Sequence, residues 1–210
     1  MVYSHHFSRN IFILYAIILL TGSLAQQNKN SDSESAHDVV KKAVNNEDHE
    51  LLKYASELPD FTEAINAREE HSGQTPLMKA VLRGKSTQFI RSLLLFGADT
   101  SIGERDGYTP MHGVGFQGRY HLVEMLVNDF GLDPNDEHED GFTPLHRACW
   151  GNTKRHSKTV EALIQVGADP NKPLCRNNRC QAPIDATNND ETKMVLKKYF
   201  ASKENDADEL

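Results

Sequence analysis

Two histidines are the first side chains whose types and spacing could do chemistry. His112 and His146 stand at the same place in two similar stretches of sequence, so a stacked pair could bind a metal ion. Zinc is held by three or four protein ligands, and this pair supplies only two. Met78 stands at the equivalent place one interval upstream, which interrupts any ladder of histidines. The sequence therefore predicts no metal site.

Three cysteines are the other candidates for chemistry. Cys175 and Cys180 are close enough in sequence to form a disulfide across a very small loop, or to act as a redox pair. Cys149 lies in an apolar stretch, where we expect a buried small apolar side chain. No Ser-His-Asp set and no paired carboxylates stand out from the charged surface residues. We therefore predict no catalytic residue and no cofactor.

Composition limits the classes of partner. The 210 residues include 23 Lys and Arg against 30 Asp and Glu, which gives a net charge of −7, and 38% are hydrophobic. This length suits one ordinary domain or a short array of repeated units. Nucleic-acid binding needs clustered cations, whereas the cations here are scattered. The sequence therefore predicts a folded chain without a nucleic-acid partner.

The first 25 residues have the pattern of a secretory signal peptide. Arg9 precedes an apolar run of ten residues, Ile11–Leu20, which is shorter than the roughly 20 residues that span a bilayer. Ser23-Leu24-Ala25 then supplies small residues suited to cleavage after Ala25. We expect residues 1–25 to be removed, with an uncleaved membrane anchor as the alternative, and residues 26–36 to form a disordered polar linker. No membrane association is expected after cleavage.

The last ten residues, 201–210, form an acidic tail. Its end, Ala207-Asp208-Glu209-Leu210, resembles the retrieval signal of soluble proteins of the endoplasmic reticulum (ER) lumen. Ala207 stands where that pattern has Lys or His, so a weaker signal or a plain acidic tail is the alternative. Together with the signal peptide, this tail predicts residence in the ER lumen, with secretion as the alternative.

A phrase built around Thr-Pro occurs three times. Pro76, Pro110 and Pro144 are evenly spaced, and we call their spacing the repeat interval; a glycine closes each unit, at Gly97, Gly131 and Gly167. The threonine before each proline can cap a helix whose first turn accepts the proline. A short helix, a glycine turn and a longer helix then follow in each unit. Neither helix can bury its apolar face alone, so neighbouring units must stack.

These units resemble ankyrin repeats. The matching phrases begin at Gly73, Gly107 and Gly141, continue through the Thr-Pro pairs, and close with Gly-Ala-Asp or Gly-Leu-Asp. The resemblance implies an all-α helical solenoid of about three full repeats plus degenerate capping repeats, with β-hairpin-like finger loops. It covers residues 37–200, as units near 37–71, 72–105, 106–139, 140–177 and 178–200. It also implies that each histidine ties its own helix start to a neighbouring loop.

The resemblance also separates core from surface. It implies that Ala80, Val81, Val114, Ala148 and Cys149 fill the core. Leu82, Phe116 and Trp150, which are separated by the same repeat interval, occupy the place that faces the concave groove. Tyr108 and Phe142 would flank this strip. Because aromatic anchors dominate binding energy at interfaces, we predict these five residues as the partner-binding set. The alternative is that the rings pack on one another and on the adjoining finger, which would close the groove.

The finger loops add charge to this surface. The first three are rich in acidic residues, at 69–70, 104–106 and 137–140, whereas Arg176 and Arg179 lie between the cysteines of the last. The sequence thus predicts a monomeric, non-enzymatic adaptor of the secretory pathway, which binds a protein or an extended peptide through its groove and fingers. The alternatives are a secreted effector or extracellular ligand binder, and a luminal redox accessory that uses Cys175 and Cys180.

Overall fold

A computed structural model describes residues 34–176 and 179–208, with only the backbone described at residues 176, 179 and 203–208. The chain divides into two units, Met1–Ser35 and Ala36–Leu210, and the helices below belong to the second. The predicted signal peptide, most of the predicted linker and the last two residues of the retrieval-like signal lie outside the described residues.

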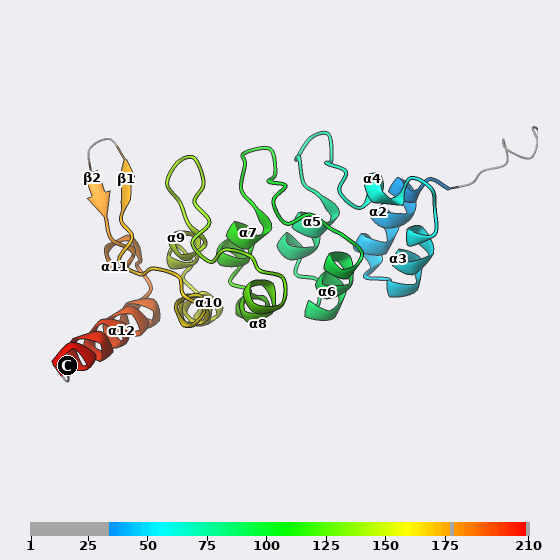
Figure 1. Ribbon diagram of the computed structural model, residues 1–210. Coiled ribbons are helices and arrows are strands. Elements are labelled where there is room, and N and C mark those ends of the chain that lie inside the picture. The colour runs from blue at the N-terminus through cyan, green and yellow to red at the C-terminus, as the bar shows by residue number, and fades with distance from the viewer. Residues whose placement is uncertain (1–33, 177–178, 209–210) are drawn as a thin grey trace, which may run out of the picture. The chain divides into compact units, whose positions relative to one another are not determined.

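Helices follow one another in pairs along the second unit (Figure 1). The pairs are α2 (Ala36–Asn46) with α3 (His49–Ser56), α5 (Pro76–Leu82) with α6 (Thr87–Leu95), α7 (Pro110–Gln117) with α8 (Tyr120–Glu124) and its π-helical continuation η2 (Met125–Asp129), α9 (Pro144–Cys149) with α10 (Lys154–Gln165), and α11 (Pro183–Ala186) with α12 (Asp190–Asp208). A short helix, α4 (Phe61–Ala64), precedes the first long loop.

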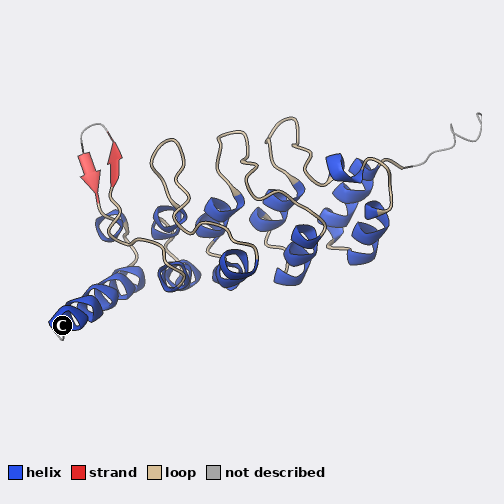
Figure 2. Cartoon of the chain, in the orientation of Figure 1, coloured by secondary structure: helices blue, strands red, loops and turns tan. Residues whose placement is uncertain are grey.

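The long loops all project from one side of the helix rows. Figure 2 shows loops before α5, α7 and α9, and a two-stranded hairpin before α11, next to the row of first helices. The hairpin pairs β1 (Leu174–Arg176) with β2 (Arg179–Gln181) in antiparallel fashion, and Cys175 lies opposite Cys180. These two cysteines form a disulfide. The last finger therefore differs from the others by a covalent link at its strands.

The Thr-Pro phrases start the first helices as predicted. Thr75 accepts a hydrogen bond from the backbone N–H of Met78 at 3.2 Å, and Thr143 accepts one from the N–H of His146. Thr109 departs from this pattern, because its hydroxyl donates to the Asp136 carboxylate at 2.6 Å. A proline occupies the first turn in each case, where a helix leaves its N–H groups unbonded.

Stacking of the pairs buries one continuous core. The predicted core residues are buried, since each is 0% exposed: Ala80, Val81, Val114, Ala148 and Cys149. The fold prediction, an all-α repeat solenoid, is confirmed. Among the helices of the described residues, none is long and apolar enough to cross a membrane. Helix α12 continues to Asp208, so its backbone extends into the segment that the sequence assigned to the acidic tail.

One outer helix differs from the sequence expectation of a regular helix. Buried Leu126 follows buried Leu93 by one residue fewer than the repeat interval of the prolines. The π-helical segment η2 restores the interval. At the end of this helix the Leu132 N–H bonds the Leu126 carbonyl, and at the same place in the preceding pair the Ala98 N–H bonds the Leu93 carbonyl. The longer span from Leu126 to Leu132 holds one extra residue. The regular spacing of the prolines therefore conceals a one-residue shift inside the third pair.

Candidate protein-binding surface

Four aromatic rings surround the guanidinium of Arg147. Its Cζ atom lies 4.4 Å from the ring centroid of Tyr108, 4.9 Å from Phe116, 5.4 Å from Trp150 and 6.0 Å from Phe142. All four distances fall within the range in which a cation is attracted to the face of an aromatic ring. We call these five residues the Arg147 cluster.

The close approach of α7 and α9 brings this cluster together. Phe116 lies near the end of α7, while Arg147 lies in α9 and Trp150 directly follows it. Gly115 makes the approach possible, because a Cβ atom on it would lie 2.1 Å from the backbone oxygen of Pro144. Any larger residue at position 115 would push the two helices apart, and with them Phe116 and Arg147.

The predicted partner-binding residues differ in exposure. Phe116 and Trp150 are 49% and 50% exposed, and Tyr108 and Leu82 are partly exposed. Phe142 is only 1% exposed, so its assignment to the partner-binding set is wrong. Its ring lies beneath Trp150, with the two ring centroids 4.5 Å apart and the planes nearly perpendicular. Phe142 therefore supports the surface from below and cannot contact a partner directly.

Tyr108 is fixed by the next finger loop. Its ring stacks on that of His138 at a centroid distance of 3.9 Å, and its hydroxyl donates to Asp140 at 2.8 Å. His138 in turn bonds the Asp140 carboxylate at 2.7 Å and the Asp106 carbonyl. The loops that contain residues 98–109 and 132–143 are thus joined beside the Arg147 cluster.

The His138 and Asp140 side chains form a charged pair in this link. Burial disfavours the charged His138, but the hydrogen bonds to Asp140 and Asp106 outweigh it and raise the pKa of His138. Burial likewise disfavours the charged carboxylate of Asp140, yet the hydrogen bonds from His138 and Tyr108 lower its pKa. Each charge thus supports the other, and the two side chains form a pair without net charge next to Tyr108.

Comparison with known proteins agrees with this architecture. The family model described as "Ankyrin repeats (3 copies)" matches residues 41–138 and 84–173, which together make up more than half of the chain. The chain belongs to the ankyrin-repeat family. Ankyrin repeats are protein-binding modules and generally non-enzymatic, so this ankyrin-repeat chain is assigned to that class.

One curated relative has similar repeats. Notch-regulated ankyrin repeat-containing protein B of Danio rerio is 36% identical over 55 residues, which are 26% of this chain and 49% of the relative. The chain thus spans about half the length of that relative. The similarity adds to the family assignment and is confined to a segment of each protein.

The two repeated histidines of this ankyrin-repeat chain are structural. His112 donates from Nε2 to the Phe142 carbonyl at 3.0 Å, and His146 donates from Nε2 to the Lys172 carbonyl at 3.0 Å. Each ring also bonds the threonine that starts its own helix. The expectation that these histidines tie a helix start to the next loop is confirmed. Over the described residues, no group of three or more His, Cys, Asp or Glu could hold a metal ion.

These histidines predict a pH dependence of stability. Burial lowers the pKa of His112 and of His146 below the usual value, so their contribution is full above the unfolded pKa of about 6.5 and decreases as the pH falls toward their folded pKa. His138 has a raised pKa, so its contribution is full below about 6.5 and is lost as the pH rises through its folded pKa. We expect the free energy of unfolding in urea to be greatest near pH 6.5.

Urea titrations at pH 5, 6.5 and 8 would check this expectation. Carboxylates such as Asp140 have unfolded pKa values near 4. The stability that they contribute is therefore lost below pH 5, outside the pH range of these titrations. A His146→Gln variant, which cannot titrate, should lose less of its stability between pH 6.5 and pH 5 than the native chain. An equal loss in both proteins would show that His146 is not responsible.

A third histidine supports Phe116 directly, and the sequence reading missed it. His156, at the start of α10, donates from Nε2 to the Phe116 carbonyl at 3.1 Å, while its Nδ1 lies 2.7 Å from the Thr153 hydroxyl. The spacing of Thr153 and His156 repeats that of Thr143 and His146. That repeated threonine-histidine spacing was the signal that could have located this support for the surface.

Cys149 has no chemical role in this surface. It is buried and free, and burial raises the pKa of its thiol to about 12. A thiol with so high a pKa carries almost no thiolate at neutral pH and is a poor nucleophile. The expectation that Cys149 acts as a small apolar core residue is confirmed.

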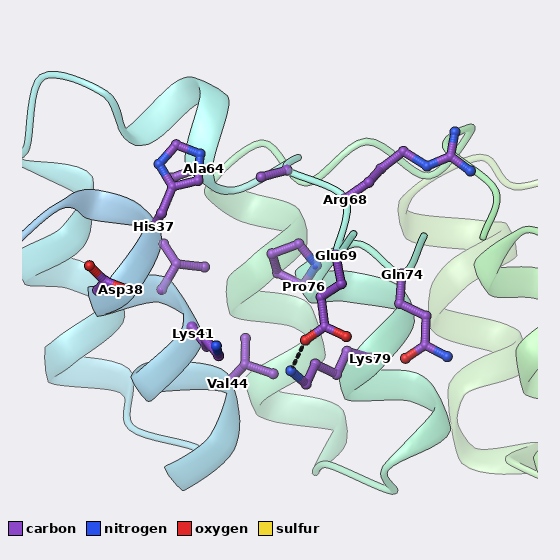
Figure 3. A pocket seen from close by; sticks show the side chains of 12 residues that line it. His37, Asp38, Lys41, Val44, Ala64, Arg68, Glu69, Gln74, Pro76 and Lys79 are labelled. Atoms are coloured by element: carbon purple, nitrogen blue, oxygen red, sulfur yellow. Dashed lines mark hydrogen bonds and ion pairs between the residues drawn. The ribbon is translucent and has the colours of Figure 1, made fainter. Parts of the chain in front are cut away.

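A pocket of about 250 Å³ lies toward the N-terminal end of the repeats, between α2 and α5 (Figure 3). Apolar side chains such as Val40, Val44 and Pro76 form part of its lining. Lys79 also lines it, is 6% exposed and forms an ion pair with Glu69. Lys79 occupies the place in α5 that Arg147 occupies in α9, two repeats later, so the pocket and the Arg147 cluster occupy corresponding faces of their repeats.

Proposed function

We propose that this chain binds a protein or an extended peptide through the exposed rings of the Arg147 cluster, with Leu82 extending the contact. The observation that carries the proposal is the pair Phe116 and Trp150, which lie at the ends of neighbouring helices and keep about half of their surface exposed. Large apolar groups that lie together on a surface mark interaction sites. Tryptophan and tyrosine are also enriched among the residues that dominate binding energy.

The surface is prepared for binding before a partner arrives. Trp150 rests on buried Phe142, and the backbone of Phe116 is held by His156. Tyr108 is fixed by its stacking on His138. Side chains that are already ordered lose less conformational freedom when a partner binds, so more of the contact energy appears as affinity. Recognition proceeds by non-covalent contact and involves no catalytic step.

We further propose that this binding takes place in the ER lumen. The supporting pattern is the apolar run Ile11–Leu20, the small residues before Ala25, and the terminal Asp208-Glu209-Leu210. The disulfide between Cys175 and Cys180 suits an oxidising compartment. Secretion to the medium is the outcome that would replace this location.

The test is affinity purification from cells that express the chain with a tag directly after Ala25. A second version lacks residues 207–210, and both the location and the co-purifying proteins are determined. We expect the full chain in the ER and the shortened chain in the medium. Equal amounts of both in the medium would overturn the proposed retrieval. A protein counts as a partner when it binds the purified chain directly.

Substitution of the two exposed rings should separate binding from folding. Trp150→Ala or Phe116→Ala is expected to weaken the partner complex by about 2 kcal/mol, roughly 30-fold in Kd. The helical signal should be retained, because half of each side chain is already exposed. Isothermal titration and thermal melting would measure the two effects. Leu95→Ala is the matched control, since Leu95 is 72% exposed at the end of outer helix α6. Equal losses of affinity for Leu95→Ala and Trp150→Ala would contradict the proposal.

A further inference from the structure

We infer that Arg147 binds a carboxylate of the partner, namely one Asp or Glu side chain within an extended segment whose neighbouring residues are apolar. The inference rests on the proposed function and specifies the chemistry of what the Arg147 cluster recognises. It is carried by the charge balance of Arg147, by the orientation of its guanidinium and by the charges around it.

Arg147 has no counter-charge within the part of the chain that the structure describes. Lys79, at the equivalent place in α5, forms its ion pair with Glu69, ten residues earlier in sequence. The residue ten positions before Arg147 is Glu137, and this carboxylate is paired with Lys172 of the next finger. The repeat therefore supplies a carboxylate, Glu137, at the place equivalent to Glu69, but this carboxylate forms its ion pair with Lys172 and not with Arg147. Arg147 is left with the aromatic rings.

The guanidinium also has hydrogen-bonding capacity to spare. The Nε atom of Arg147 is buried and has no hydrogen-bond partner among the described residues. The side chain as a whole is only partly buried. Arginine has five N–H donors in a rigid fork, which matches the two oxygens of a carboxylate. Cation–ring contacts use the face of the guanidinium and leave its N–H edge for hydrogen bonds.

The surroundings favour a singly charged group. Arg147 supplies one positive charge, while the nearby His138 and Asp140 form a pair without net charge. A carboxylate matches that single charge, whereas a phosphate brings more negative charge than Arg147 alone can balance. Phe116 and Trp150 offer apolar surface next to the guanidinium. A partner segment with one acidic residue between apolar residues satisfies both features.

The test is selection of phage-displayed random 12-residue peptides on the chain purified from eukaryotic cells. We expect the enriched peptides to share one Asp or Glu at a fixed place among apolar residues. The highest-affinity peptide is then synthesised with its acidic residue and with the matching amide, Glu→Gln or Asp→Asn. Native chain should bind the amide peptide at least about tenfold more weakly, the loss that follows when a hydrogen bond to a charged group is removed.

Two variants assign that loss to Arg147. Arg147→Met keeps a long apolar side chain against the rings, so the fold should be retained, and it should bind the acidic and amide peptides equally. Arg91→Met is the matched control, because Arg91 also lies over a ring, that of Phe130, but pairs with Asp129 at 2.5 Å. It should retain the tenfold preference. The native chain tested with the two peptides needs no protein variant, so the inference can fail even when Arg147→Met does not fold.

Each other outcome contradicts a defined statement. Enriched peptides without an acidic residue, whose binding is lost in Trp150→Ala, would overturn the role of Arg147 and leave the proposed binding surface standing. The same conclusion follows when Arg147→Met keeps the tenfold preference. Enrichment of no peptide by the native chain, or of peptides that bind Trp150→Ala equally well, would overturn both the inference and the binding surface.

Discussion

The Gly115→Ala substitution is expected to cost more than about 3 kcal/mol of unfolding free energy, because it forces apart the two helices that are most closely packed around the Arg147 cluster. The added Cβ atom would lie 2.1 Å from the backbone oxygen of Pro144. That oxygen belongs to the first turn of α9 and cannot rotate away as a side chain could. The helices must therefore separate along their shared face.

The same helix offers a matched control for this substitution. Gly113 lies two residues earlier, and a Cβ atom there would meet side chains only, that of Met78 at 3.2 Å and that of Val81 at 3.3 Å. Gly113→Ala also gains helix propensity of about 1 kcal/mol, so its net effect should be small. Urea unfolding followed by circular dichroism would measure both variants. Equal stabilities of Gly113→Ala and Gly115→Ala would show that the α7–α9 contact is not sterically limited.

Separation of α7 from α9 should also change how the array unfolds. Repeat proteins are stabilised by interfaces between neighbouring units, so a weakened interface divides the array into parts that unfold separately. We expect the Gly115→Ala variant to show two transitions where the native chain shows one. Its tryptophan fluorescence, which reports Trp150, should follow the transition of the C-terminal part.

Phe142→Ala should also be strongly destabilising, with a loss of about 3 to 5 kcal/mol. The ring is 1% exposed and lies beneath Trp150, so its removal leaves a cavity at the base of the surface. Trp150→Ala removes a larger side chain but, since half of it is exposed, should cost only about 1 to 2 kcal/mol.

Chemical denaturation of the Phe142→Ala and Trp150→Ala variants would check this order. The comparison is informative because the two rings touch and differ chiefly in burial. A smaller loss for Phe142→Ala than for Trp150→Ala would mean that Phe142 is not part of the core. Because Phe142 supports Trp150, its replacement should also weaken partner binding, although Phe142 itself does not reach the partner.

Much of the fold was predictable because the helix-capping threonines and the buried apolar residues recur at the same places in successive repeats. Thr75 and Thr143 cap their helices, and the apolar positions that follow, such as Val81 and Ala148, are buried. These features depend on short-range spacing, which a single sequence displays directly. The one-residue shift absorbed by η2 was not predictable, since the prolines keep the repeat interval on either side of it.

The binding surface was predicted only in part. Phe116 and Trp150 lie at equivalent places in successive repeats, and this regularity located them. Phe142 was assigned to the surface because it occupies the same place in its repeat as Tyr108 does one repeat earlier. Tyr108 is partly exposed, but the ring of Trp150 covers Phe142. Arg147 was missed because its importance depends on Lys172 capturing Glu137, a contact between loops that spacing along one chain does not reveal.

Asparagines join consecutive loops at two places, and their arrangement has a mechanical consequence. Asn66 donates to the Gly97 carbonyl at 3.1 Å, and Asn135 donates to the Gly167 carbonyl at 2.9 Å. Each amide oxygen also accepts an N–H from the next loop. Ser101 occupies the corresponding place between them, and its hydroxyl bonds Asp99 within its own loop.

A hollow of about 270 Å³ lies beside Ser101 at this middle junction. The loops 98–109 and 132–143 are nevertheless joined at this junction, by the stacking of Tyr108 on His138 and by the hydrogen bond from Thr109 to Asp136. All three junctions are therefore tied, and the middle one is tied in part by Tyr108 of the Arg147 cluster. A force that a bound partner exerts on Tyr108 thus passes into both loops.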